Sequence, residues 1–116
     1  MNLNNLTLKS QETVQAAQRI ASEKGHQQIE NEHLFQALLD VDENVLPYLF
    51  KKLHVNFGLL KQLNERALKS FSKVEGGQQT LSQKASQTLV NAVNLAKRMG
   101  DDFVATENLL IPLVEY

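Results

Sequence analysis

Carboxylates are the side chains whose type and spacing in this sequence best suit the binding of a ligand at the protein surface. The phrase GHQQIENEHLFQALLD, residues 25–40, returns as GDDFVATENLLIPLVE, residues 100–115, and both copies carry a glutamate at the same offset, Glu32 and Glu107. The helix dipole favours a carboxylate in the first turn of a helix by ~0.3–1 kcal/mol, which can explain both glutamates. It does not explain the run Asp101-Asp102. Beside Glu107, this run either attracts basic residues of an extended polypeptide or is a solvated loop.

Signatures of catalysis and of metal binding are absent from the sequence. No glycine is followed by Gly-Lys-Ser/Thr at the spacing of a phosphate-binding loop. His26, His33 and His54 form neither an HExxH motif nor a pair on one helix face. We therefore expect solvated or capping histidines, no metal site, no cofactor in this chain and no catalytic site.

Length and composition narrow the class of protein. The 116 residues are 42% hydrophobic with a formal net charge of -1, which predicts one domain with a modest core. Mixed charges leave no basic face for nucleic acid or an anionic membrane. Cysteine is absent, no apolar run approaches the ~18 residues of a membrane span, and MNLNNLTLKSQ lacks the regions of a signal peptide. We expect a cytoplasmic protein or fragment.

Long runs of helix-forming residues, with only two prolines and five glycines, predict an all-α fold. Gly25 and Gly100 can end the first and fifth helices in the left-handed conformation. Pro47 is tolerable only in the first turn of the third helix, and Pro112 should bend the sixth. The expected N-cap residues of the first five helices are Thr7, Asn31, Asn44, Asn56 and Ser82.

The repeat extends beyond the opening phrase, because a shift of 75 residues aligns the second part of the chain with the first without a gap. Such a duplication predicts two similar halves packed about a pseudo-twofold axis, with a binding groove between them. We expect a first copy of four helices at residues 1–72, a linker at 73–80, and an incomplete second copy at 81–116. The aligned pairs include Leu6/Leu81, Thr7/Ser82, Thr13/Thr88, Ala17/Ala92, Ala21/Ala96, Gly25/Gly100, Ile29/Val104, Glu32/Glu107, Leu34/Leu109 and Leu38/Leu113.

The fifth helix carries more apolar residues than one narrow core stripe needs. We expect most of them to pack in the core and some to be exposed in a shallow groove, which suits unfolded polypeptides that present hydrophobic segments without a fixed sequence. The residues concerned are Leu89, Val93, Leu95, Ala96 and Met99.

The doubled motif resembles the N-terminal Clp repeat domain of the ClpA, ClpB and ClpC ATPases. The residues that carry the resemblance are Leu6-Thr7, GHQQI at 25–29 and NEHLFQALL at 31–39, and SKVEGG at 72–77 is similar to the form found in ClpB-type disaggregases. The resemblance implies about eight helices in two four-helix halves, of which this chain supplies roughly six. It also implies a domain that recruits substrates for a ring-forming AAA+ chaperone.

The resemblance further implies which residues bind. A threonine at the first helix start, with an aspartate and a glutamate flanking the last loop, corresponds to Thr7, Asp101 and Glu107. Leu95 keeps the apolar character of the groove in relatives. Two groove leucines of relatives appear here as Asn91 and Asn108, so either a more polar groove or a rearranged apolar wall is expected. Thr7 can equally serve only as a helix cap.

The leading hypothesis is therefore the N-terminal domain of a ClpB-like disaggregase that binds unfolded or aggregated polypeptides. Its other partner would be the rest of the hexamer, ATP and magnesium are expected only in the ATPase modules absent from this chain, and the isolated domain should be a monomer. One alternative is a ClpC- or ClpA-like domain that docks adaptors or phosphoarginine-marked proteins, with Glu32 and Glu107 meeting a guanidinium. A hydrolase or transferase with an unrecognised site and a structural dimerisation domain stay open. We expect function to be weighted toward the second copy, where Asp101-Asp102 replaces His26-Gln27.

Overall fold

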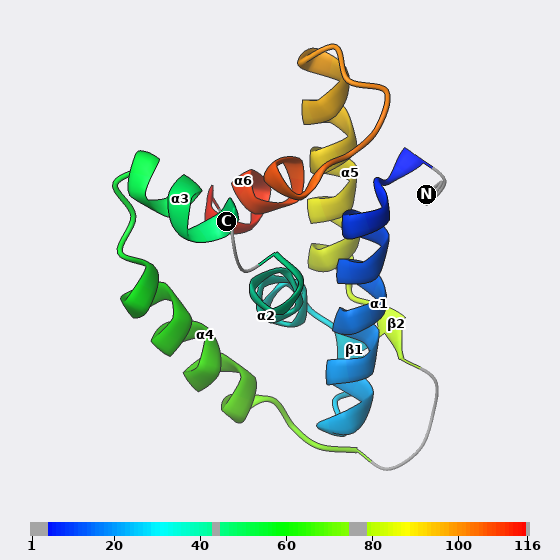
Figure 1. Cartoon of the computed structure of the whole chain (residues 1–116). Coiled ribbons are helices and arrows are strands. Elements are labelled where there is room, and N and C mark those ends of the chain that lie inside the picture. Colours follow the sequence, from blue (N-terminus) through cyan, green and yellow to red (C-terminus); the bar gives the residue numbers. More distant parts are fainter. Residues whose placement is uncertain (1–4, 43–44, 75–78, 116) are drawn as a thin grey trace.

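The computed structural model describes residues 5–42, 45–74 and 79–115, which form six α-helices and two very short strands (Figure 1). The all-α prediction is confirmed, and the small sheet is an addition that the sequence did not indicate. The elements are α1 (Leu8–Glu23), β1 (Gln28–Ile29), α2 (Asn31–Val41), α3 (Val45–Lys52), α4 (Phe57–Ser70), β2 (Thr80–Leu81), α5 (Gln83–Arg98) and α6 (Thr106–Glu115).

Helix ends follow the expected local chemistry in most places. The side-chain oxygens of Thr7, Asn56 and Ser82 accept hydrogen bonds from the backbone N–H three residues on, which caps α1, α4 and α5. Gly25 and Gly100 have φ of 70° and 78°, the left-handed conformation that ends α1 and α5 without a Cβ penalty.

The expected cap of α2 was wrong. Asn31 is the first residue of α2, and Glu30 is its N-cap. The ring nitrogen Nδ1 of His33 accepts a hydrogen bond from the Glu30 N–H at 2.8 Å, so a histidine satisfies the backbone group that a capping box usually gives to glutamate or glutamine. The cap predicted at Asn44 lies outside the described residues.

The two prolines sit inside helices. Pro47 lies in the first turn of α3, where its missing N–H removes no helical bond, as predicted. Pro112 lies inside α6, which continues as a helix to Glu115. The bend expected at Pro112 stays a prediction.

The duplication is visible as a reciprocal exchange of backbone contacts between the two copies. Leu6, before α1, pairs in parallel with Val104, whereas its equivalent Leu81, before α5, pairs in parallel with Ile29. The Thr7 N–H donates to the Val104 carbonyl at 2.9 Å, and the Ser82 N–H donates to the Ile29 carbonyl at 3.0 Å. Because Ile29 and Val104 are themselves equivalent, each copy gives the other the same pair of contacts. This reciprocity is the expected pseudo-twofold relation.

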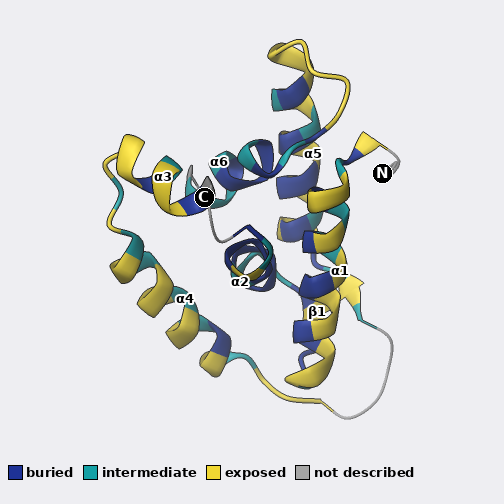
Figure 2. Ribbon diagram, viewed as in Figure 1, coloured by how far each residue is buried: buried dark blue, intermediate teal, exposed yellow. Residues whose placement is uncertain are grey.

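One core unites the copies. Equivalent residues such as Ala17 and Ala92, each fully buried, and Leu34 and Leu109, each 2% exposed, belong to the same hydrophobic cluster. A second cluster around Phe35 and Phe50 joins α2 and α3 to Leu110 of α6. Figure 2 shows buried residues along the inward sides of α1, α2, α5 and α6, whereas α4 is mainly exposed or half-buried and buries Leu68 near its end. Helix α4 ends at Ser70, two residues earlier than expected.

Candidate functional site

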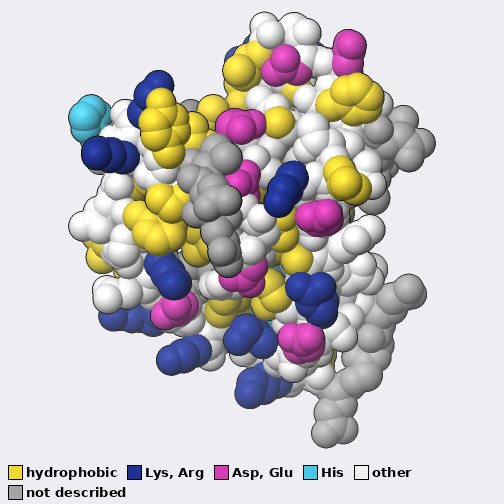
Figure 3. Space-filling view, in the orientation of Figure 1, with side chains coloured by type: hydrophobic (Ala, Val, Ile, Leu, Met, Phe, Trp, Pro, Cys, Tyr) yellow, Lys and Arg dark blue, Asp and Glu magenta, His cyan; other side chains and the backbone are white. Residues whose placement is uncertain are grey.

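The loop between α5 and α6 is the acidic, exposed part of the second copy. We call residues 99–105 the second loop and the equivalent residues 24–30 the first loop. In the second loop, Met99 to Phe103 are all exposed, with Met99 at 59% and Phe103 at 55%. Asp101 and Asp102 stand between these two apolar side chains. Acidic and hydrophobic side chains lie together over the end of α5, at the upper edge of the view in Figure 3.

The fold brings three of the predicted site residues to this loop. The backbone pairing of Leu6 with Val104 places Thr7 beside the second loop, at a residue that follows Asp101 and precedes Glu107 in sequence. Glu107 lies in the first turn of α6, as predicted, where the helix dipole favours its charge. Leu8, next to Thr7, is 71% exposed and adds apolar surface.

The hydroxyl of Thr7 makes hydrogen bonds within the chain that cap α1. Its hydroxyl oxygen accepts from the Ser10 N–H at 3.2 Å, and the hydroxyl is also 3.0 Å from the Ser10 hydroxyl, to which it donates. Ser10 is fully buried and Thr7 is half-buried. The structure thus assigns Thr7 a capping role, and its contact with polypeptide stays a prediction.

The apolar residues of α5 and its C-cap lie partly in the core and partly at the surface, as predicted. Leu89 and Ala96 are buried in the core, Val93 and Leu95 are half-buried, and Met99 is exposed. Leu95 therefore has part of its surface available for binding, but no structural observation places a ligand on it.

The two asparagines expected to make the groove more polar differ in exposure, and a polar groove at Asn91 stays a prediction. Asn91 is exposed and accepts from the Gln87 side chain at 2.9 Å. Asn108 is only 2% exposed, because its Oδ1 accepts from the Ala105 N–H at 2.8 Å and its Nδ2 lies 3.5 Å from the Met99 sulfur. Asn108 thus caps α6 as His33 caps α2, and it does not polarise an open groove.

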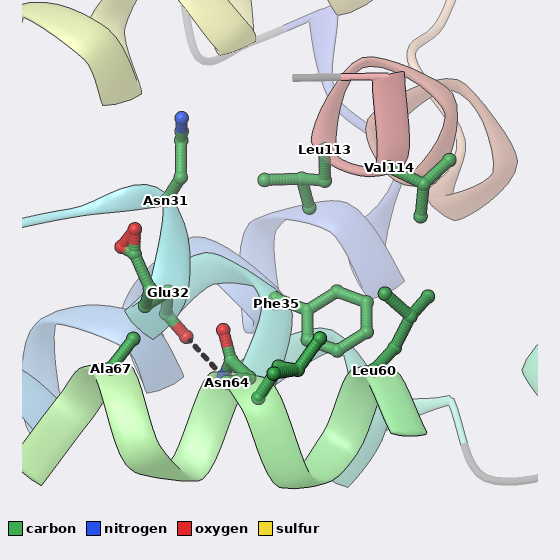
Figure 4. Close-up of a pocket in the computed structure, with 9 residues that line it drawn as sticks. Asn31, Glu32, Phe35, Leu60, Asn64, Ala67, Leu113 and Val114 are labelled. Atoms are coloured by element: carbon green, nitrogen blue, oxygen red, sulfur yellow. Dashed lines mark hydrogen bonds between the residues drawn. The ribbon is translucent and has the colours of Figure 1, made fainter. Parts of the chain in front are cut away.

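Glu32 lies on a different surface from Glu107. A groove of about 290 Å³ runs between α2 and α4 and is closed by Leu113 and Val114 of α6 (Figure 4). Its walls are mainly apolar, and Glu32 and Asn31 stand at one end. Burial raises the pKa of the Glu32 carboxyl, and the charge of Glu30 adds to this rise. Glu107 does not line this groove, so the structure does not join the two glutamates in one pocket.

A buried histidine pair that the sequence did not predict joins the first loop to α2. His26 Nδ1 and His33 Nε2 are 2.7 Å apart, and the ring of Phe71 packs against both. Since His33 Nδ1 accepts from the Glu30 N–H, the proton of neutral His33 is on Nε2 and is donated to His26. Burial lowers the pKa of His33 to about 4, and burial also lowers that of His26, with the charges of Lys24 and Lys73 adding to it.

These histidines therefore correct one expectation and confirm another. His33 caps α2, which is one of the two roles expected for the histidines. His26 is 3% exposed, so the other expected role, a solvated side chain, is wrong for it. Two buried histidines facing each other look like metal ligands, but across the described ranges no group of three His, Asp or Glu side chains is arranged to hold an ion. Among the same residues, no helix is long and apolar enough to cross a membrane.

Comparison with known proteins decides the family. Residues 5–116 match the Clp repeat (R) N-terminal domain. The chain belongs to this Clp repeat family. It is 38% identical over 114 residues to the chaperone protein ClpB of Bacteroides thetaiotaomicron and 34% identical over 114 residues to ClpB of Porphyromonas gingivalis. Each alignment covers 98% of this chain and 13% of the relative, so the chain spans about an eighth of the length of the curated relatives that it matches.

Solved structures share the Clp repeat fold. The Hsp104 N-terminal domain of Candida albicans has a TM-score of 0.84 at 20% identity, covering 96% of this chain and 74% of that one. The N-terminal domain of the ClpV1 ATPase from E. coli has a TM-score of 0.85 at 21% identity, covering 97% of this chain and 69% of that one. A ClpV N-domain in complex with a VipB peptide has a TM-score of 0.78 at 16% identity, covering 97% and 71%. The described residues thus have the fold of a Clp N-domain.

Proposed function

We propose that this domain recruits unfolded or aggregated polypeptide for a ClpB-like disaggregase. In this proposal the domain is a non-catalytic binding module, and the ATPase ring that uses ATP and magnesium lies in other parts of the parent protein. The similarity to ClpB chaperones over nearly the whole chain supports this choice within the Clp repeat family.

One observation supports the location of the site. The second loop exposes two carboxylates between two large apolar side chains, and the Leu6–Val104 pairing holds Thr7 beside it. A surface that joins negative charge to exposed apolar area suits segments of unfolded chain that carry basic and hydrophobic residues. Few contacts and the ordering of a flexible ligand predict weak affinity.

A titration with a permanently unfolded protein tests the proposal. Labelled, reduced and carboxymethylated α-lactalbumin is titrated into the wild-type chain and into the double variant Asp101→Ala/Glu107→Ala. The double variant should bind about two- to thirtyfold more weakly, because each exposed ion pair contributes ~0.2–1 kcal/mol. The matched control is Glu12→Ala/Glu65→Ala, which removes two exposed carboxylates from α1 and α4. If Asp101→Ala/Glu107→Ala leaves the affinity unchanged, or if both double variants lower it equally, the second loop does not bind the unfolded protein.

A second candidate function is docking of adaptors or phosphoarginine-marked proteins, as in ClpC- or ClpA-like domains. The observation in its favour is an unpartnered Oε2 of Glu32, buried at the end of the α2–α4 groove, because a guanidinium is a matching donor for such an oxygen. Free phosphoarginine should then bind, and Glu32→Ala should abolish the binding. Binding that survives both Glu32→Ala and Glu107→Ala contradicts this candidate.

A further inference from the structure

An extended segment of the chain covers the first loop. We call residues Phe71–Val74 the strap. The Val74 N–H donates to the Gly25 carbonyl at 2.7 Å, and Lys73 forms an antiparallel bridge with His26. Phe71, two residues before Lys73, packs edge-on against His26 with ring centroids 5.3 Å apart. The strap thus binds the first loop through one backbone pairing and one aromatic side chain.

The second loop has the same backbone as the first. Gly25 and Gly100 have nearly equal positive φ, and the residue after each glycine donates its N–H to the carbonyl of the equivalent alanine, His26 to Ala21 at 2.8 Å and Asp101 to Ala96 at 2.9 Å. The carbonyl edge that the strap uses on the first loop is therefore formed on the second loop as well.

This edge is uncovered on the second loop. A Cβ added to Gly25 would meet the Val74 carbonyl oxygen at 3.3 Å, whereas a Cβ added to Gly100 would meet nothing within 4 Å. In the part of the chain that the structure describes, no backbone N–H donates to the Gly100 carbonyl. The second loop presents an unpaired acceptor in open space, and its neighbours Met99 and Phe103 are exposed apolar side chains.

The charges of the two loops differ, and this difference determines which side chains a bound polypeptide segment should carry. The strap brings Lys73 next to His26, and burial, with the charges of Lys24 and Lys73, lowers the pKa of His26 and so disfavours its charged form. At the equivalent place the second loop carries Asp101, followed by Asp102. A basic side chain two residues after an aromatic one, the pattern of Phe71 and Lys73 themselves, would meet carboxylates there instead of an imidazole.

We propose that the second loop binds an extended segment of another polypeptide by antiparallel backbone pairing at the Gly100 carbonyl, as the strap pairs with Gly25. The bound segment carries a basic residue opposite Asp101 and an apolar or aromatic residue two positions earlier. This inference rests on the proposed function and specifies how the polypeptide is held. Backbone pairing suits unfolded clients because every extended segment offers the same N–H groups, while side chains set only a preference.

A peptide with the strap's own sequence is the most direct probe. The octapeptide LKSFSKVE, residues 68–75, is titrated into the ¹⁵N-labelled 116-residue chain. Amide shift changes are expected at Gly100 to Phe103 and not at Gly25 to Gln28. A peptide N-methylated at its valine, which loses the N–H that Val74 uses, should bind at least tenfold more weakly. The control is N-methylation at the lysine, because the Lys73 N–H donates to no group among the described residues.

A charge variant completes the test. Asp101→Lys should weaken binding of the unmodified peptide at least fivefold, and Glu65→Lys, on exposed α4, should leave it unchanged. Equal affinity of the two N-methylated peptides overturns the pairing. Shift changes at Gly25 to Gln28 also overturn it, because the peptide would then replace the strap on the first loop. If no peptide binds while unfolded α-lactalbumin still depends on Asp101 and Glu107, the pairing fails and the proposed function stands. If that dependence is absent too, both fail.

Discussion

The first and second loops share a backbone but not an environment. Both contain a glycine in the left-handed conformation, and both are followed by a side chain that caps the next helix, His33 in one copy and Asn108 in the other. The first loop is covered by the strap and closed over a histidine pair, whereas the second is open, acidic and flanked by exposed apolar residues. The duplication thus builds one scaffold twice and leaves the second loop uncovered by the strap.

The largest expected effect tests whether the two copies contribute equally to the shared core. Leu34→Ala and Leu109→Ala each delete a side chain that is 2% exposed in the shared cluster. Each should lower the free energy of unfolding by about 2–5 kcal/mol, from lost burial and an unfilled cavity. Urea denaturation followed by circular dichroism measures both. If Leu109→Ala lowers the free energy of unfolding by less than half as much as Leu34→Ala does, the two copies do not contribute equally to stability.

The histidine pair should make the first loop sensitive to acid. The pKa of His33 in the folded chain is about 4, below its ordinary value of 6.5, so between these pH values the unfolded chain binds more protons than the folded one. Stability should therefore fall as the pH drops from 6.5 to 4 and be fully retained above 6.5. Other groups face this pair: Lys24 and Lys73 disfavour its protonation, and Glu30 lies at the cap.

Replacing the histidine with its counterpart separates capping from titration. His33→Asn should keep a cap of the kind that Asn108 provides but leave His26 without its donor, lowering the free energy of unfolding at pH 7 by about 1–3 kcal/mol. The dependence on pH between 4 and 6.5 should become shallower. Denaturant midpoints measured across this pH range check both statements. If the dependence of stability on pH is unchanged in His33→Asn, His33 is not the source of that dependence.

The two matched helix caps should have effects of similar size on stability. Thr7→Ala and Ser82→Ala each remove a hydroxyl that accepts from a backbone N–H, and each should cost ~1 kcal/mol. If Thr7 also contacts polypeptide, Thr7→Ala alone should weaken binding of unfolded α-lactalbumin. Equal binding by the two variants would leave Thr7 with a structural role only.

The smallest effect concerns the paired glutamates. Because burial raises the pKa of Glu32, the folded chain disfavours its charge, and this cost is fully present once the pH exceeds the raised value. Glu32→Gln should therefore raise the free energy of unfolding at pH 7, by up to about 0.5 kcal/mol. Glu107→Gln, which loses a favourable dipole contact, should lower it slightly. Thermal melts of the two variants at pH 7 should move in opposite directions.

Sequence reasoning predicted much of the scaffold because the scaffold depends on local chemistry. Thr7, Asn56 and Ser82 are caps and Gly25 and Gly100 are helix ends for reasons that reach only a few residues along the chain. The cap at Asn31 was wrong because α2 begins at Asn31 itself, with Glu30 as its N-cap and a capping box formed by Glu30 and His33. The shift of 75 residues revealed the duplication directly.

The site was harder to predict because it depends on contacts between distant segments. The histidine pair involves Phe71, some 40 residues away, and the strap pairs Lys73 with His26 without any sequence signal. Asn108 looked like a groove residue, but its burial follows from a cap and from Met99. The family resemblance grouped Thr7 with Asp101 and Glu107, and the Leu6–Val104 pairing places Thr7 beside the loop that contains Asp101. The division at residues 73–80 stays a prediction.

Hydrogen exchange of the two loops tests most directly the claim that one copy is scaffold and the other binds. The backbone amides of Asp102 and Phe103 are compared with those of Gln27 and Gln28, in the free chain and with saturating unfolded α-lactalbumin. The account predicts slower exchange at Asp102 and Phe103 on binding and no change at Gln27 and Gln28. Protection confined to the first loop, or to the α2–α4 groove between Asn31 and Ala67, would contradict it.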